Sequence, residues 1–211
     1  MIYAVLAGIP EVAVILFAWS RYGILTWSKE SVRKISVLSL ILTALSVTMN
    51  VLMYRQQYRP VTCINLMIVF TVLAAAAGID YKKQIIPNRL ILAGLACRVI
   101  LLGAEFIMYP DTARQSLLMS CAGMLFGLLL LLILSFLTRR GIGYGDVKLF
   151  AWLGLCIGVM DLYNVLFYSV LFAAITGIFL LAAKKADKKQ KMPFAPFVFM
   201  GSYVVFIMAL L

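Results

Sequence analysis

The acidic residues of this sequence are its main candidates for chemistry, because it contains no histidine. Without histidine, it cannot build His-based catalytic triads, Cys-His nucleophiles or the usual zinc-hydrolase motifs. A hydrolase of this composition would use two carboxylates, one taking a proton from water and the other giving a proton to the scissile amide. Asp80 and Asp146 are the candidates for such a pair, because both fall at the same predicted edge of apolar segments.

Asp80 lies between a run of small residues, Ala74–Gly78, and Pro87. Small residues let helices approach closely in lipid, and Pro87 disfavours a helical conformation at Ile86. We therefore expect Asp80 to end one span and a tight cytoplasmic turn to lead into the next. The alternative is an ordinary Asp at a helix end, although the helix dipole makes a C-terminus unfavourable for a carboxylate.

Asp146 closes a glycine-rich run that begins at Gly141. Alternate glycines disfavour a helix and permit unusual dihedral angles or a close backbone approach. Val147 and the apolar residues after it can form a helix, so we expect Asp146 to be its N-cap. Gly143 and Gly145 either let the loop move and the substrate backbone approach, or only form a tight turn.

The composition places these two residues in a membrane protein. Of the 211 residues, 64% are hydrophobic and 13% are charged, whereas a soluble domain is about half apolar and about one quarter charged. We therefore predict an all-α, polytopic helical membrane protein with about eight transmembrane helices, six of them long. Residues 1–61 would form N-terminal spans without a cytoplasmic domain, and residues 62–211 the membrane-embedded core. The predicted spans are 2–19, 35–53, 62–79, 89–108, 116–137, 147–160, 162–183 and 194–211.

The basic residues predict the orientation of these spans. Alternate loops are rich in Lys and Arg, whereas the loops between them contain only Arg55, Arg59 and Arg114. Cytoplasmic loops carry such an excess, so both termini would lie outside and both aspartates would face the cytoplasm. The placement of the basic residues between apolar segments argues against nucleic-acid binding. The Lys184–Lys191 run is either a lipid-facing anchor or part of the catalytic machinery. The basic loops are 20–34, 80–89, 138–148 and 184–193.

The four cysteines, Cys63, Cys97, Cys121 and Cys156, each lie alone in an apolar stretch. The absence of a CxxC pair argues against a structural zinc site. We expect no metal and no cofactor.

Three motifs, in order, resemble those of the type IV prepilin peptidases, which are GxGD membrane aspartic peptidases. The stretch from Asp80 to Asn88, with Lys82, resembles the first aspartate motif, and Gly143–Leu149 the GxGD motif. Met192–Phe197 resembles the proline–phenylalanine motif before the last span. The resemblance covers residues 70–211 and implies that Asp80 and Asp146 are catalytic. It implies positioning roles for Gly143, Gly145, Lys148, Pro87, Asn88, Pro193, Phe194 and Pro196.

The resemblance also implies the substrate and the location. The enzyme would remove the short basic leader of a prepilin or pseudopilin precursor at the cytoplasmic face of the inner membrane, serving a type IV pilus or protein secretion. Longer members carry a cytoplasmic domain, often with paired CxxC motifs, and also N-methylate the product. Loop 20–34 is short and lacks cysteine, so methylation is not expected. The oligomeric state is left open.

The helix ends predict unequal roles for the two aspartates. A carboxylate at a helix C-terminus holds a proton more readily than one at an N-terminus. We therefore predict Asp146 as the main base and Asp80 as the main acid. Lys148 either tunes Asp146 or reaches the lipid headgroups. The rival functions are a small transporter, a presenilin-like protease and a non-catalytic assembly factor.

Overall fold

The computed structural model describes residues 2–24, 29–137, 143–183 and 192–211. These residues form seven α-helices and no strand, which confirms the all-α class. Five of the helices are long and apolar enough to cross a membrane, and the count of about eight spans remains a prediction. The helices are α1 (Ile2–Arg21), α2 (Lys29–Arg55), α3 (Pro60–Lys83), α4 (Asn88–Met108), α5 (Pro110–Leu137), α6 (Tyr144–Ala182) and α7 (Ala195–Leu210).

Prolines mark the first turns of three helices. Pro60 and Pro110 are the first residues of α3 and α5, and Pro196 is the second residue of α7. Proline suits these positions because the N–H that it lacks would have no partner inside the helix. The prolines therefore suit the positions at which these helices begin.

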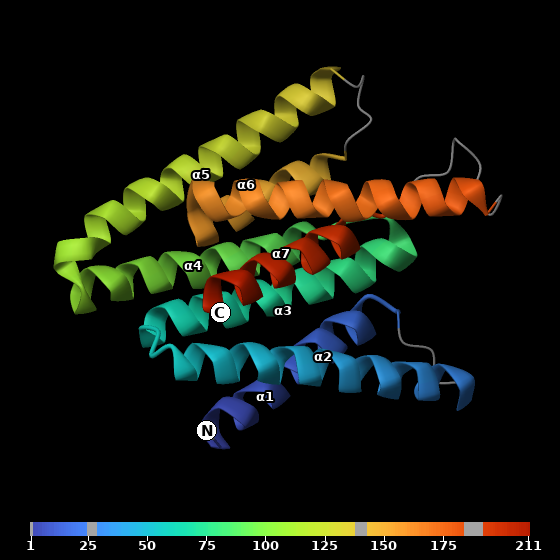
Figure 1. Ribbon diagram of the computed structural model, residues 1–211, viewed down its shortest axis with the longest axis horizontal. Helices are drawn as coiled ribbons and strands as arrows, with labels where there is room; N and C mark the ends of the chain where they lie inside the picture. The colour runs from blue at the N-terminus through green and yellow to red at the C-terminus, as the bar shows by residue number, and fades with distance from the viewer. Residues whose placement is uncertain (1, 25–28, 138–142, 184–191) are drawn as a thin grey trace.

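Helix α6 contains a sharp break at Gly158, where φ is 79° and ψ is −178°. This conformation is open essentially only to glycine. Leu162, after the break, packs against Gly154, before it, so the two arms of α6 fold back on each other. The break lies near the expected boundary between the predicted spans 147–160 and 162–183. In Figure 1 the later arm, in orange, runs back along the bundle.

The carbonyl groups that lose their partners within the helix at this break accept hydrogen bonds from buried side chains of other helices. Asn65 of α3 donates to the Cys156 carbonyl over 2.9 Å, and Arg98 of α4 donates to the Leu155 carbonyl over 3.1 Å. The last carbonyls of a helix have no partner within it, and lipid offers none. Arg98 also forms a 2.8 Å ion pair with Glu105, so this charge lies inside the bundle with a partner.

Helix α3 lies at the centre of the bundle and packs against α1, α4 and α7. In Figure 1, α3, α4 and α7 lie between the α1–α2 pair and the α5–α6 pair. Helices α5 and α6 approach so closely that a Cβ on Gly123 would lie 2.3 Å from the Gly154 carbonyl oxygen. This is the close packing that small residues permit in lipid.

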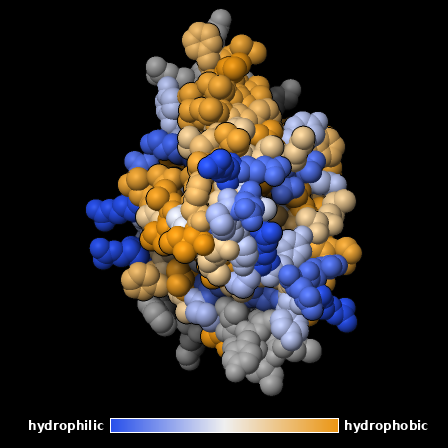
Figure 2. Space-filling view, turned by 90° about the vertical axis from the view of Figure 1, so that its left-hand side faces the viewer, coloured by the Kyte–Doolittle hydropathy of each residue, from blue (hydrophilic) through white to orange (hydrophobic). Residues whose placement is uncertain are grey.

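The sides of the bundle are apolar, as a membrane protein requires. Large hydrophobic side chains such as Phe17, Ile107 and Phe136 are more than two-thirds exposed. Figure 2 views the end that carries the α2–α3 and α4–α5 turns, where hydrophilic residues gather amid hydrophobic ones. Two basic clusters from the orientation argument, Arg139–Arg140 and Lys184–Lys191, lie outside the described residues.

Candidate active site

Asp80 lies in the last turn of α3, as expected, and its side chain is only 6% exposed. The small residues before it let α1 pack against this turn. Trp19 donates its indole N–H to the Ala75 carbonyl over 3.2 Å, and a Cβ on Gly78 would lie 2.2 Å from the Trp19 ring. The small-residue run therefore holds the helix end that carries Asp80 in a fixed position.

The expected turn after Asp80 is present. Helix α3 ends at Lys83, and Gln84 adopts the left-handed conformation while donating its N–H to the Asp80 carbonyl. Pro87 is the N-cap of α4, and Asn88 is the first residue of that helix. The chain thus reverses within residues 84–87, which keeps Pro87 and Asn88 near the end of α3.

Asp146 lies at the start of α6, but it is not the N-cap that we expected. The helix begins at Tyr144, and the N-cap is Gly143. Asp146 is instead the third helical residue, and its carboxylate interacts with the Gly143 N–H. An acid at this position commonly reaches back to the N–H of the N-cap. This contact helps to explain why the helix begins three residues before Val147.

Gly145 joins the two aspartate segments. A Cβ on Gly145 would lie 3.1 Å from the Cβ of Ile86, in the turn between α3 and α4. Glycine therefore allows the first turn of α6 to pack directly on the turn that follows Asp80. Sequence reasoning treated Ile86 as the residue before Pro87 and as part of the first aspartate motif, and it missed this packing role.

The first turn of α7 forms the third side of the site. The Ala195 N–H donates to Asp80 Oδ2 over 3.0 Å in a buried contact. Phe194 stacks on Phe150 of α6, with ring centroids 6.0 Å apart and an interplanar angle of 18°. Pro193 precedes Phe194, and Pro196 lies in the first turn of the helix. The predicted proline–phenylalanine motif therefore lies against both aspartate-bearing helices.

The structure brings Asp80 and Asp146 together at one end of the bundle. Their carboxylates are close enough for the charge on one to act on the other. When two carboxylates share a site, the charge on one disfavours the charge on the other. A pair of which one member is ionised and the other protonated can supply one proton acceptor and one proton donor, which is what water-mediated amide hydrolysis needs. No group of metal-ligating side chains occurs among the residues that the structure describes.

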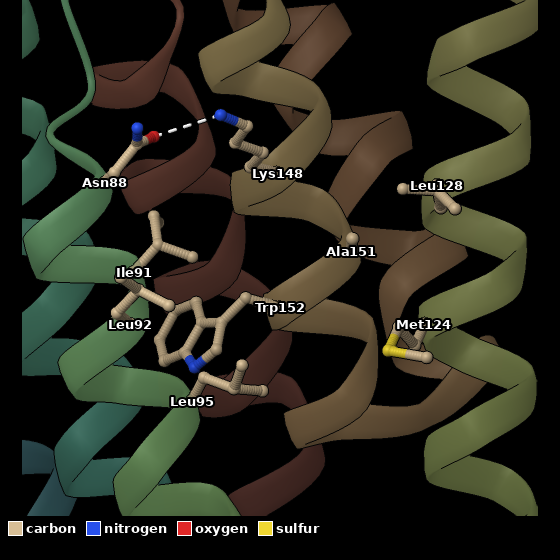
Figure 3. Close-up of a pocket in the computed structure, with 9 residues that line it drawn as sticks. All are labelled: Asn88, Ile91, Leu92, Leu95, Met124, Leu128, Lys148, Ala151 and Trp152. Atoms are coloured by element: carbon tan, nitrogen blue, oxygen red, sulfur yellow. Dashed lines mark hydrogen bonds between the residues drawn. The ribbon is translucent and has the colours of Figure 1, made fainter.

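Lys148 lies on the face of α6 opposite Asp146, since two residues along a helix correspond to about half a turn. Its Nζ donates to Asn88 Oδ1 over 3.1 Å, which links α6 to α4. Below this bond lies an apolar cavity of about 400 Å³ between α4, α5 and α6 (Figure 3). Trp152 and Leu95 line it. The cavity therefore lies on the side of α6 that faces away from Asp146.

Residues 67–178, just over half of the chain, match the sequence profile of the type IV leader peptidase family, Peptidase_A24. The chain belongs to the type IV leader peptidase family. The stretch that matches this family contains Asp80 and Asp146, whereas the first turn of α7 lies beyond it. The resemblance seen in the three motifs is thus confirmed at the level of the family.

Three relatives in this family are each named prepilin leader peptidase/N-methyltransferase. The protein from Bacillus subtilis (strain 168) is 34% identical over 137 residues, which are 65% of this chain and 52% of that protein. The Xanthomonas campestris pv. campestris protein is 30% identical over 135 residues, 64% of this chain and 46% of that protein. The Aeromonas hydrophila protein is 32% identical over 139 residues, which are 64% of this chain and 46% of that protein. The chain spans about half the length of the curated relatives it matches, and no solved structure matches it significantly.

Proposed function

We propose that this protein is a membrane aspartic endopeptidase that removes the short leader of type IV prepilin-like precursors at the cytoplasmic face of the membrane. Asp80 and Asp146 are its catalytic pair, and residues 62–211 form its peptidase core. The meeting of these two carboxylates at one end of the bundle, on separate helices, is the observation that carries the proposal.

The reaction needs only the two carboxylates and water. The ionised carboxylate takes a proton from a water molecule, whose oxygen attacks the scissile carbonyl carbon. The protonated carboxyl gives its proton to the departing amide nitrogen. No covalent intermediate forms with the protein. The apolar sides of the bundle keep the dyad at the membrane edge, where the apolar segment of a precursor lies.

The basic loops support the cytoplasmic orientation. The turn at residues 84–87, the start of α6 and the start of α7 lie at the same end of the bundle. Loops with an excess of Lys and Arg face the cytoplasm in membrane proteins, and the helix ends that flank the basic loops of this sequence lie at this end (Figure 1). The substrate we propose is a precursor with a short basic leader followed by an apolar segment.

The proposal includes peptidase activity but not N-methylation, although the relatives' names include both. The loop between α1 and α2 contains no cysteine, whereas a paired CxxC zinc site would need four. A transporter would place its charged site near the middle of the membrane, whereas Asp80 and Asp146 lie at helix ends.

Cleavage of a purified prepilin in detergent micelles tests the proposal. The wild-type protein should shorten the precursor, and Asp80→Asn and Asp146→Asn should each lower the rate by about a thousandfold or more, as expected for loss of a group on which proton transfer depends. Asp161→Asn is the matched control, because Asp161 is a half-buried acid in α6 beyond the break. Normal turnover by either dyad variant would refute the proposal.

A further inference from the structure

The first turn of α7 has two backbone N–H groups without a helical partner. Pro193 and Pro196 have no N–H to offer. The N–H groups of Phe197 and Val198 already donate to the Phe194 carbonyl, over 3.0 and 3.2 Å. The amides of Phe194 and Ala195 therefore remain, and they are adjacent at the positive end of the helix dipole.

Both of these amides act on one carboxylate. Ala195, which is fully buried, donates to Asp80 Oδ2 over 3.0 Å. The Phe194 N–H interacts with the same Asp80 carboxyl group. A backbone N–H can only donate, so it favours a carboxylate over a protonated acid, which would offer its own hydrogen. Asp146 receives one such interaction, from Gly143.

We propose that the first turn of α7 holds Asp80 as the ionised member of the dyad, so that Asp80 is the base and Asp146 carries the proton. Phe194 and Ala195 are then positioning residues that act through their main-chain amides, and the two prolines leave those amides available. This inference rests on the proposed function. It reverses the roles expected from the helices that carry the two aspartates, because the α7 N-terminus opposes the α3 C-terminus at Asp80 and its two amides outweigh the α6 N-terminus at Asp146.

The other charged side chains near the site do not account for a charge on Asp80. Lys82 donates to the Ile24 carbonyl, and Lys148 donates to Asn88. Arg89 is exposed. Among the residues that the structure describes, no Lys or Arg forms an ion pair with Asp80. Asp146 is the acidic group that faces it. Among the groups that the structure describes, the amides of α7 are therefore the ones that stabilise its charge.

Infrared spectroscopy of two variants tests the assignment without relying on activity. In Asp146→Asn only Asp80 of the dyad titrates, and in Asp80→Asn only Asp146 does. Difference spectra against the double variant isolate the carboxyl band of the remaining aspartate. We expect Asp80 to ionise at a lower pH than Asp146, by about one pH unit or more, as one additional hydrogen bond to a charged group implies. The opposite order, or equal values, would overturn the proposal.

A backbone change then tests whether α7 is the cause. Replacing Ala195 by lactic acid turns its amide into an ester, which removes the N–H and leaves the side chain unchanged. The same change at Phe194, with phenyllactic acid, removes the second donor. Loss of a donor makes Asp80 harder to ionise. We therefore expect each variant to move the acid limb of the pH profile of kcat/KM for prepilin cleavage to higher pH, by about one pH unit.

The matched control is the same ester at Ala113, a buried alanine in the first turn of α5 whose N–H donates to the Tyr109 carbonyl over 3.0 Å. Its acid limb should stay at the wild-type pH. An unmoved limb in both α7 ester variants would show that the turn only shapes the fold. Cleavage that survives loss of the dyad aspartates would instead refute the proposed function, so the two failures are distinguishable.

Discussion

Replacing Gly145 by alanine should slow cleavage without weakening the fold. The added Cβ would lie 3.1 Å from Ile86 Cβ, whereas carbon atoms in good contact are about 3.5–4.0 Å apart. The first turn of α6 and the turn after α3 must therefore separate by a few tenths of an ångström. Asp146 directly follows Gly145, so its carboxylate moves with the helix, away from Asp80.

The expected size follows from this displacement. A misplacement of about 1 Å at a catalytic group costs about a hundredfold in rate, so a few tenths should lower kcat/KM by about three- to tenfold. Alanine also favours a helix over glycine by up to about 1 kcal/mol, so thermal stability should not fall. A loss of rate without a loss of stability is the signature of this contact.

The assay compares kcat/KM for prepilin cleavage, and thermal unfolding, in the wild-type protein, Gly145→Ala and Gly103→Ala. Gly103 lies in α4, and a Cβ there would meet no atom within 4 Å, so it controls for helix propensity alone. If Gly145→Ala cleaves as fast as Gly103→Ala, the contact with Ile86 does not position Asp146. The glycine would then serve only the turn.

Three further changes probe the fold and the edge of the site. Gly158→Ala should destabilise the protein by about 1–3 kcal/mol, because the glycine-only conformation at the break becomes strained. Arg98→Met should destabilise the protein by about 3–5 kcal/mol, because the half-buried Glu105 loses its cation and keeps only the bond from Ser116. Arg98→Met with Glu105→Leu should recover much of that loss. Both effects are measured by thermal unfolding in detergent. Lys148→Met should keep prepilin cleavage within about twofold of wild type, because Lys148 bonds Asn88 on the face of α6 away from Asp146.

Each of these expectations has a clear counter-result. Unchanged stability of Gly158→Ala would mean that the break relaxes to another conformation. A double variant no more stable than Arg98→Met would mean that the arginine acts mainly through the Leu155 carbonyl. A tenfold loss of cleavage in Lys148→Met would show that its charge acts on Asp146.

Local signals in the sequence predicted the surroundings of Asp80 well. Pro87 implied the turn that the structure shows at residues 84–87, and the small residues before Asp80 implied a close helix contact, which Trp19 makes. These features depend on neighbours in the chain, so composition and spacing are sufficient to predict them. The break in α6 was similarly anticipated by a boundary at residues 160–162, close to Gly158.

Features that depend on distant residues were not predictable in the same way. The start of α6 was placed at Val147 because glycine disfavours a helix, whereas packing on Ile86 and the contact from Asp146 to Gly143 extend the helix to Tyr144. The bond from Ala195 to Asp80 joins residues 115 positions apart. Its donor is a main-chain N–H, which residue type does not reveal. The spacing of the two prolines was the available signal.

The bonds at the α6 break constrain how this protein enters the membrane during synthesis. The first arm of α6 ends in carbonyl groups that depend on Asn65 and Arg98, and unsatisfied carbonyls are costly in lipid. This arm is therefore poorly suited to enter the bilayer before α3 and α4 are in place. Both partners precede it in the chain, so synthesis delivers them first. Membrane integration of α6 should accordingly depend on Asn65 and Arg98, which makes α6 a segment whose insertion is coupled to tertiary folding.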